Sequence, residues 1–450
     1  MSARGQDISD GNISDGNISI GVDFGTSNTV VALATPDGRA EVIRFDHSGA
    51  KLSAFVTALC FWEERRGTGS LGLKVEGGPW AMDQLMAGGT AHRFIQSFKT
   101  FAASSSFQET RIFRQRYRFE DLLFAFLNTL TRHGAGAFDF AGARLIIGRP
   151  VTFAGSHPNE ALAMQRYASA FDRLGAASTS YVYEPVGAAF FYARRLDHDA
   201  TVLVADFGGG TSDFSVMRFE RSDGRLRAEP LGHSGVGIAG DTFDYRIVDK
   251  VVSPRLGKGS SYRSLDKLLT VPNHYYANLA RWHQLAMMKS NGDLAGLRDL
   301  AKVALDRAAL EAFIDIVDYD LGLALYRAVS AAKVTLSSEE QAAFRFAEEG
   351  VEIEATITRR DFEAWIAPDV ARIAATVDEV LAKSGVGEAG IERVFLTGGT
   401  SFVPAIRNLF VERFGAAKLT NTDQFESIAS GLALIGQDAD GGRWAVGQAA

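Results

Sequence analysis

The feature that most constrains the fold is a short pattern that occurs twice. Each copy is an apolar strand that ends in an aspartate, turns through glycine and hydroxyl residues and continues as a second strand. The copies are Val22-Asp-Phe-Gly-Thr-Ser-Asn28 and Ala205-Asp-Phe-Gly-Gly-Gly-Thr-Ser-Asp213. Glycine lets the backbone take positive φ angles and approach a ligand closely, and successive amide groups in such a turn bind anions. One copy alone is equally compatible with an ordinary turn, but two copies favour a pair of phosphate-binding hairpins.

The aspartate in each copy adds a metal-binding group to the predicted phosphate site. Mg²⁺ bound to nucleotide phosphates keeps most of its waters and takes only one or two protein carboxylates. Two hairpins with one aspartate each, Asp23 and Asp206, could therefore hold a Mg-nucleotide between them.

Composition and charge exclude several classes of protein. The chain has 450 residues, 46% of them hydrophobic and 22% charged, which is typical of a globular protein with two or more domains. Its net charge of −7 gives no support for a nucleic-acid partner. No apolar run is long enough to cross a membrane, and the N-terminus does not resemble a signal peptide. Cys60 is the single cysteine, which excludes an intrachain disulfide. We therefore expect a cytoplasmic protein with no membrane or nucleic-acid partner.

The segment from Arg93 to Arg118 runs against the net charge. It contains six cationic residues and a single acid, Glu109. The cations are Arg93, Lys99, Arg111, Arg114, Arg116 and Arg118. Two interpretations remain open: a solvated hairpin, or a segment of which part reaches over the bound phosphates.

The order of predicted elements indicates an α/β protein with two lobes of duplicated architecture. A three-strand meander over 18–45 is followed by strands and helices that should extend it as a mixed sheet, and the same plan begins again at Thr201. We expect loop with a short helix over 67–89, and a helix opened by His157-Pro158-Asn159. The expected units are a disordered leader over 1–17, lobe I over 18–198 completed by a helix at 422–437, lobe II over 199–421, and a flexible tail over 438–450.

Two further glycine motifs precede predicted helices. Gly235-Val-Gly-Ile-Ala-Gly240 matches a dinucleotide-binding pattern, but the expected acidic residue at the end of a following strand is missing. A turn that faces a phosphate or ribose from a helix N-terminus fits better. Leu396-Thr-Gly-Gly-Thr-Ser401 is a third strand with a glycine turn and could serve in the same way. The chain contains neither a P-loop nor a kinase catalytic loop, and its eight histidines show no metal-ligand or triad spacing.

Taken together, these pieces resemble the nucleotide-binding domain of the heat-shock-seventy (DnaK-type) chaperones, within the actin, hexokinase and heat-shock superfamily. The resemblance covers about residues 18–436 and rests on five ordered blocks: Gly21–Ser27, Ser97–Lys99, Glu184–Ala188, Asp206–Asp213 and Leu396–Thr400. It implies a two-lobed, ribonuclease-H-like (actin-like ATPase) architecture with mixed sheets flanked by helices and a nucleotide cleft between the lobes.

The same resemblance implies roles for individual residues. Asp23 and Asp206 would hold Mg²⁺ through water, Lys99 would orient the attacking water, Glu184 would join the metal or water network, and Thr211 would lie near the γ-phosphate. The predicted catalytic residues are thus Asp206, Lys99, Glu184 and Thr211. The predicted residues for binding ATP or ADP are Gly25, Thr26, Ser27, Asn28, Gly208, Gly209, Gly210, Gly237, Gly240, Asp241, Lys333, Ser337, Gly398, Gly399, Thr400 and Phe402.

Two departures from the family pattern limit what it implies. Val334 and Phe402 stand where the family usually places arginines over the adenine, and Ser330 stands where it has a glutamate, so selectivity for adenine stays open. The family's apolar linker and peptide-binding β-domain have no counterpart in the tail that begins at Gln437. The chain is therefore similar to truncated, YegD-like members, with no peptide gripped by a substrate domain.

Our leading hypothesis is a slowly hydrolysing, chaperone-like ATPase that acts as a two-lobe switch and signals to a partner protein or exchange factor on the upper parts of the lobes. Three alternatives remain open. They are a nucleotide sensor or scaffold without significant turnover, a small-molecule kinase of the same superfamily, and a protein that polymerises as actin does.

Overall fold

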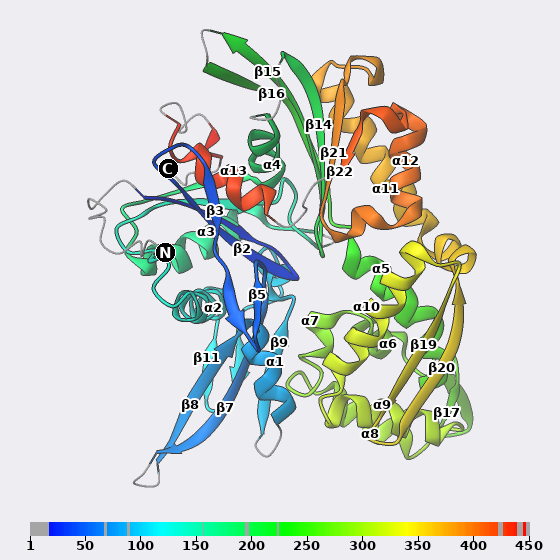
Figure 1. Ribbon diagram of the computed structural model, residues 1–450. Coiled ribbons are helices and arrows are strands. Elements are labelled where there is room, and N and C mark those ends of the chain that lie inside the picture. The colour runs from blue at the N-terminus through cyan, green and yellow to red at the C-terminus, as the bar shows by residue number, and fades with distance from the viewer. Residues whose placement is uncertain are drawn as a thin grey trace, which may run out of the picture.

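The structure is a computed structural model that describes residues 18–66, 70–87, 91–155, 157–193, 198–222, 225–421, 426–438 and 444–446. The predicted leader over 1–17 and most of the predicted tail lie outside these residues. Two mixed sheets, each with its own set of helices, form the upper parts of two lobes (Figure 1).

The first sheet has the order β13-β12-β1-β2-β3, with β6 paired to β2. Strands β1, β2 and β3 form an antiparallel meander, and β12 and β13 extend it parallel to β1. The strands are β1 (Ser19–Phe24), β2 (Asn28–Ala34), β3 (Ala40–Val42), β6 (Phe55–Val56), β12 (Arg144–Arg149) and β13 (Ser178–Tyr183). Ile20, Val22 and Phe24, which share one face of β1, are fully buried, and Gly21 on the other face lies against α13, so this central strand is covered on both faces.

The second sheet repeats this topology. Its order is β16-β15-β14-β21-β22, and again a three-strand meander is extended by two strands parallel to its first strand. The strands are β14 (Ala200–Phe207), β15 (Ser212–Ser222), β16 (Arg225–Val236), β21 (Arg393–Thr397) and β22 (Leu419–Asn421). The predicted duplication of architecture and the mixed-sheet α/β fold class are confirmed.

The lower part of lobe I is an insertion between β3 and β12. It contains a three-stranded sheet of order β8-β7-β9 and two small hairpins. The elements are β4 (Phe45–His47), β5 (Ala50–Leu52), β7 (Ala58–Arg66), β8 (Ser70–Gly77), α1 (Gly78–Ala87), β9 (His92–Gln96), the 3-10 helix η1 (Phe98–Phe101), β10 (Thr110–Ile112), β11 (Gln115–Tyr117) and α2 (Phe119–His133). The prediction of loop over 67–89 missed β8. Alternating Leu73 and Val75 pack on the lobe core there, although the glycines of this segment weaken its strand signal.

The lower part of lobe II is an insertion between β16 and β21, and is mostly helical. Its helices are α5 (Gly240–Ile247), η3 (Val248–Val252), η4 (Ser253–Leu256), α6 (Asn273–Leu279), α7 (Trp282–Leu285), α8 (Asp293–Ala301), α9 (Arg307–Asp318) and α10 (Gly322–Ser338). Its strands are β17 (Ser261–Ser264), β18 (Lys267–Thr270), β19 (Gln341–Glu348) and β20 (Val351–Thr358). The chain then returns to the upper part through α11 (Arg359–Ser384), which packs on β15 and β16, and η5 (Glu388–Gly390). Hairpin β19–β20 turns at Glu349-Gly350, as predicted.

The remaining helices flank the sheets: α3 (Glu160–Phe171) with η2 (Asp172–Leu174), α4 (Glu184–Ala193), η6 (Gly399–Phe402), α12 (Pro404–Phe414) with η7 (Ala416–Lys418), and α13 (Ser427–Ile435). Helix α3 begins one turn later than predicted. Asn159 caps it by accepting a hydrogen bond from the Leu162 amide at 3.0 Å, so Pro158 precedes the helix.

Helices α4 and α13 join the lobes at the centre of the molecule (Figure 1). A Cβ atom on Gly431 of α13 would lie 1.8 Å from the carbonyl oxygen of Gly187 in α4, so only glycine permits this contact. A Cβ on Gly21 would lie 2.1 Å from the Ala429 carbonyl, so α13 also lies directly on β1.

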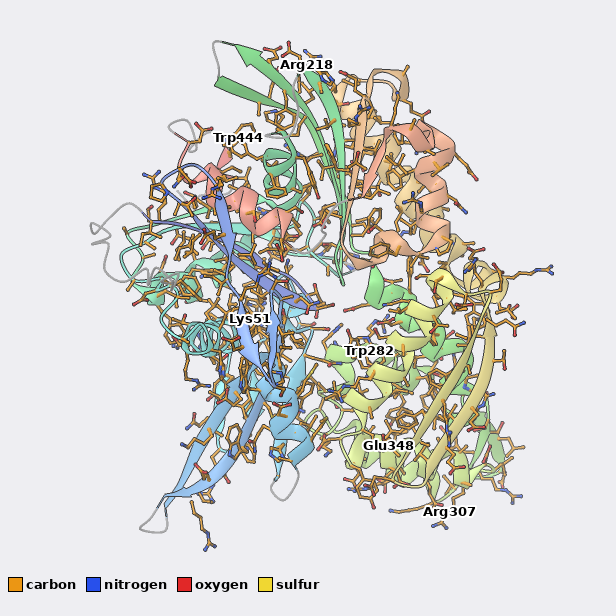
Figure 2. The ribbon with its side chains drawn as sticks, viewed as in Figure 1. Lys51, Arg218, Trp282, Arg307, Glu348 and Trp444 are labelled. Carbon is orange, nitrogen blue, oxygen red and sulfur yellow. The ribbon has the colours of Figure 1, made fainter. Side chains whose placement is uncertain are left out.

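Within the predicted tail, Trp444 is buried against Phe190 of α4 (Figure 2), and the Val446 amide donates to the Tyr181 carbonyl at 2.8 Å. Among the described residues, no helix combines the length and apolar character needed to cross a membrane.

Candidate functional site

The two glycine turns meet at a cavity between the lobes. Its volume is about 230 Å³, and it lies below the joined helices α4 and α13, where β1 and β14 end. Eighteen of the predicted site residues line it: Asp23, Gly25, Thr26, Ser27, Asn28, Lys99, Glu184, Asp206, Gly208, Gly209, Thr211, Gly240, Asp241, Lys333, Ser337, Gly398, Gly399 and Thr400. Gly210, Gly237 and Phe402 do not line it.

The two turns approach each other so closely that glycine, which has no Cβ atom, is required at the contact points. A Cβ on Gly209 would lie 2.4 Å from the hydroxyl of Ser27 in the other hairpin. A Cβ on Gly25 would lie 2.2 Å from the Asn28 carbonyl and would close the first turn. Glycines at these positions leave the lining of both turns without side-chain cover, while the Gly208 amide itself donates to the Thr211 carbonyl at 2.9 Å.

Asp23 and Asp206 face this cavity from opposite hairpins, and their charges interact. Removal from bulk water and the charge of Glu184 raise the pKa of Asp23 to about 7, while Lys99 lowers it. Burial, Glu184 and Asp23 raise the pKa of Asp206 well above its usual value. Two carboxyl groups that are removed from bulk water and interact through their charges favour binding of a cation between them.

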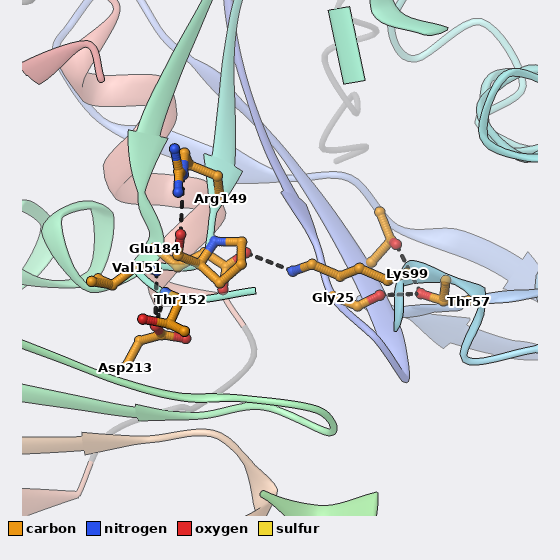
Figure 3. Close-up of polar contacts among 10 residues, drawn as sticks. Gly25, Thr57, Lys99, Arg149, Val151, Thr152, Glu184 and Asp213 are labelled. Atoms are coloured by element: carbon orange, nitrogen blue, oxygen red, sulfur yellow. Dashed lines mark hydrogen bonds and ion pairs between the residues drawn. The ribbon is translucent and has the colours of Figure 1, made fainter. Parts of the chain in front are cut away.

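Lys99 and Glu184 form a buried ion pair at the wall of the cavity (Figure 3). The Lys99 Nζ donates to Glu184 Oε1 at 2.7 Å, and both side chains are less than a tenth exposed. Burial alone would lower the pKa of Lys99, but Glu184 and the other nearby anions raise it overall, so this lysine stays charged.

The turn that carries Lys99 is held from behind by Arg166 of α3. The buried Arg166 guanidinium donates to the carbonyls of Phe101, Ala102 and Ser104 at 2.8, 2.9 and 3.1 Å, and also to Phe107. These bonds satisfy the carbonyl groups at the end of η1. They fix the position of Lys99 although Arg166 itself does not line the cavity.

Asp213 is a functional candidate that the sequence prediction left without a role. Its Oδ1 accepts hydrogen bonds from the Val151 and Thr152 amides of lobe I, at 2.8 and 3.1 Å (Figure 3). Its Oδ2 is buried without a hydrogen-bond partner among the described residues. Burial and Glu184 raise its pKa to about 7. Its position at the end of the second glycine motif could have identified Asp213 from the sequence, because it is the register partner of Asp206 in the β14–β15 pair.

The lobe II end of the cavity is organised around Lys333 of α10. Lys333 Nζ lies 2.6 Å from Asp244 and 3.3 Å from the Gly240 carbonyl. Asp244 is buried and also accepts a hydrogen bond from the Trp282 indole at 3.2 Å. Asp244 and Tyr326 line the cavity, and the sequence prediction missed both because nothing local distinguishes them from helix-packing residues.

Ser330 and Val334, two of the positions that depart from the family pattern, line the same end of the cavity. Val334 is 66% exposed and Phe402 is 50% exposed. The mouth at this end is therefore uncharged at both positions.

The cationic residues of the segment from Arg93 to Arg118 lie in different parts of the molecule. Lys99 faces the cavity, whereas Arg111 and Arg116 lie on the hairpin β10–β11, where their side chains are exposed. Arg93 crosses to lobe II, where it donates to the Ala286 carbonyl and to the Met287 sulfur.

The comparisons with known proteins agree with this architecture. The model of the family described as Hsp70 protein matches residues 303–443. A relative named Chaperone protein DnaK, from Thermosipho melanesiensis, is 24% identical over 417 residues, which cover 92% of this chain and 58% of the relative. Over these residues, this chain is similar to the Hsp70 family.

Other relatives cover a shorter part of this chain. A Chaperone protein DnaK from Deinococcus deserti is 23% identical over 256 residues, and a Chaperone protein HscA homolog from Haemophilus influenzae is 24% identical over 252. Each of these alignments covers 56% of this chain. The chain spans 58%, 33% and 30% of the lengths of the three relatives.

Proposed function

We propose that this protein binds ATP with magnesium between its lobes, hydrolyses it slowly and uses the change to switch the relative position of the lobes. The observation that carries the proposal is the meeting of two aspartates, from two hairpins of equivalent topology, across one cavity that also holds the Lys99–Glu184 pair. Similarity to the Hsp70 family supports nucleotide binding, because the relatives that the chain matches are named as DnaK and HscA chaperones.

The residues present fit a hydrated magnesium ion. The described residues contain no group of three or more His, Cys, Asp or Glu side chains that could ligate a metal directly. Two carboxyl groups with raised pKa, beside glycine turns that carry no side-chain cover, suit an ion that keeps its waters and a phosphate chain beside it. Asp23 and Asp206 would hold the ion, which would supply charge neutralisation for the phosphates.

The protein's own residues would bind the phosphates, orient the attacking water and stabilise the developing charge. Gly208 and Gly209, with Thr26 and Ser27, line the part of the cavity where phosphates would bind. Lys99 stays protonated and lies where it can orient a water and stabilise negative charge that develops during phosphoryl transfer. Lys333 and Ser337 lie on one helix and would contact the nucleoside.

The test is hydrolysis of bound ATP in a single turnover, measured as ADP formed, for the natural chain and for Lys99→Ala and Asp206→Ala. We expect each substitution to slow hydrolysis by about a hundredfold or more. Lys383→Ala is the matched control, because Lys383 also pairs with a carboxylate, at 2.7 Å, but is about half exposed and remote from the cavity. Circular dichroism establishes that each variant is folded. Hydrolysis at the natural rate in either site variant contradicts the assigned roles.

A second candidate is a nucleotide sensor without significant turnover. One observation favours it: Lys99 is already bound by Glu184 at 2.7 Å, so this charge is engaged before any ligand arrives. ATP that binds tightly but yields no ADP above the spontaneous rate would support the sensor and exclude the ATPase.

A further inference from the structure

A second cavity lies on the outer face of lobe I, away from the nucleotide site. Its volume is about 380 Å³, and it is lined by residues of β8, β11, α2 and η2. We call it the α2 groove. The lining residues that matter here are Val75, Arg116, Tyr117, Phe124, Arg132 and Arg173. We infer that the α2 groove binds an extended, acidic peptide segment of a partner protein.

Charge is the first argument. The neighbouring hairpin β10–β11 and its flanks carry Arg111, Arg114, Arg116 and Arg118 against Glu109, within a chain whose net charge is −7. A local positive surface on an acidic protein attracts acidic partners and repels basic proteins.

The three arginines that line the groove are held in place yet keep free donors. Arg116 pairs with Glu109 at 3.0 Å and is 78% exposed, and Arg132 pairs with Glu76 at 2.6 Å and is 52% exposed. Arg173 pairs at 3.1 Å with Asp121, the acidic residue of the groove lining, and lies 3.7 Å from the centre of the Phe124 ring. A guanidinium has five N–H donors, so one carboxylate partner leaves donors available for a ligand.

The strand edges are the second argument. Among the described residues, β8 pairs only with β7, and β11 pairs only with β10, so each has one edge that forms no ladder. The Val75 carbonyl of β8 accepts a hydrogen bond from Arg132 at 3.4 Å, which shows that this edge faces the groove. An unpaired strand edge binds an extended peptide by main-chain hydrogen bonds, and its side-chain pockets set the sequence preference.

The lining also predicts the pattern of the peptide. Val75, Tyr117, Phe124 and Ala125 form an apolar part of the lining, whereas the arginines are its charged and exposed part. Side chains of an extended peptide alternate between two faces. An alternation of acidic and apolar residues would therefore place carboxylates against the arginines and apolar groups against the aromatic rings.

The experiment is fluorescence anisotropy of a labelled eight-residue peptide of alternating Glu and Val, titrated with the full chain. We expect binding that weakens as salt rises, and no comparable binding of the matched Gln-Val peptide. Arg116→Glu should weaken binding about tenfold, because it reverses one charge of the groove. Asn128→Trp, at an exposed groove position, should block binding. A Glu-Val peptide methylated on alternate amides should bind more weakly if main-chain pairing contributes.

The control variant is Arg345→Ala, since Arg345 is 75% exposed and pairs with Glu354 at 3.2 Å in another two-stranded hairpin. Equal binding of the Gln-Val peptide, or binding unchanged in both groove variants, would overturn the inference. So would stronger binding of a single-stranded oligonucleotide that displaces the peptide. Self-association abolished by Arg116→Glu, with no peptide binding, would assign the groove to a second copy of this chain and also overturn it.

Discussion

At the scale of single residues, Gly398 fixes the third glycine turn against the second hairpin. Its φ of 83° is a left-handed value, and a Cβ at this position would lie 2.0 Å from the Phe207 carbonyl of β14. The neighbouring Gly399 also lines the cavity, but a Cβ there would meet nothing within 4 Å. The two adjacent glycines therefore have different physical requirements.

We predict that Gly398→Ala lowers the free energy of unfolding by about 2 to 3 kcal/mol, from backbone strain and from the clash with Phe207. Gly399→Ala, the matched control, should change it by less than about 0.5 kcal/mol. Urea denaturation of the two variants measures both values. Equal losses in the two variants would contradict this account of the turn.

His283 should make the lobe contact sensitive to acid. It lies in α7 of lobe II, with its ring 5.1 Å from the Phe101 ring of lobe I. Burial and the charge of Arg281 lower the pKa of His283 from 6.5 to about 4. Between pH 6.5 and 4 the unfolded chain therefore binds a proton that the folded protein does not, so this histidine reduces stability as the pH falls through that range.

Replacing His283 with Phe removes this titration. We predict that the difference in melting temperature between His283→Phe and the natural chain increases, in favour of the variant, as the pH falls from 7 to 4.5. Thermal unfolding at a series of pH values measures it. A difference that does not depend on pH would show that His283 does not titrate in this way.

At the scale of elements, the 3-10 helix η1 positions Lys99, and α3 supports η1 through Arg166. One buried guanidinium donates to four carbonyl groups of the Phe101–Phe107 segment. The Phe101 and Ser104 carbonyls also accept backbone hydrogen bonds, from Ser104 and Phe107, whereas Ala102 would lose the guanidinium as a buried partner, which costs more than the hydrogen bond alone.

We predict that Arg166→Ala slows single-turnover hydrolysis about tenfold or more, while the affinity for Mg-nucleotide changes by less than about threefold. We expect the rate to change more than the affinity because Arg166 orients Lys99 but does not line the cavity. Arg173→Ala, on the outer side of the same lobe, is the control and should leave hydrolysis unchanged. Parallel losses of affinity and rate in Arg166→Ala would indicate a general loss of folding instead.

Elements with a strong local signal could be predicted from the sequence. Strand β21 was predicted with its observed bounds of Arg393–Thr397, and hairpin β19–β20 and the repeated meander follow from alternation and glycine turns. The features that were missed depend on long-range contacts. Strand β8 is stabilised by pairing with β7, and the Asp213 contact with Val151 joins residues 62 positions apart. Arg166 likewise acts through carbonyls about 60 positions away in the chain.

At the scale of the whole molecule, two contacts join the lobes on either side of the cavity. Helices α4 and α13 pack together above it (Figure 1). The lower parts of the lobes meet where Met287 of lobe II is buried in the core of lobe I. Arg93 donates to the Met287 sulfur at 2.9 Å, and Thr110 donates to it at 3.4 Å. The lower contact is small, and it must separate if the lobes move apart to release a nucleotide.

We predict that Met287→Ala accelerates release of a fluorescent ADP analogue by about tenfold, because it removes buried apolar contacts that the open state does not make. Arg218→Ala is the control, because Arg218 is exposed on the upper hairpin, far from this contact (Figure 2). Stopped-flow fluorescence measures the release rates. Release at the natural rate in Met287→Ala would show that this contact does not limit exit.

The most direct test of the central claim is calorimetric titration of the purified chain with ATP, with and without magnesium, for the natural protein and for Asp23→Asn combined with Asp206→Asn. The account predicts one site per chain, binding that depends on magnesium in the natural protein, and loss of that dependence in the double variant. Heat that is absent for every nucleotide, or that is identical with and without magnesium in both proteins, would contradict it.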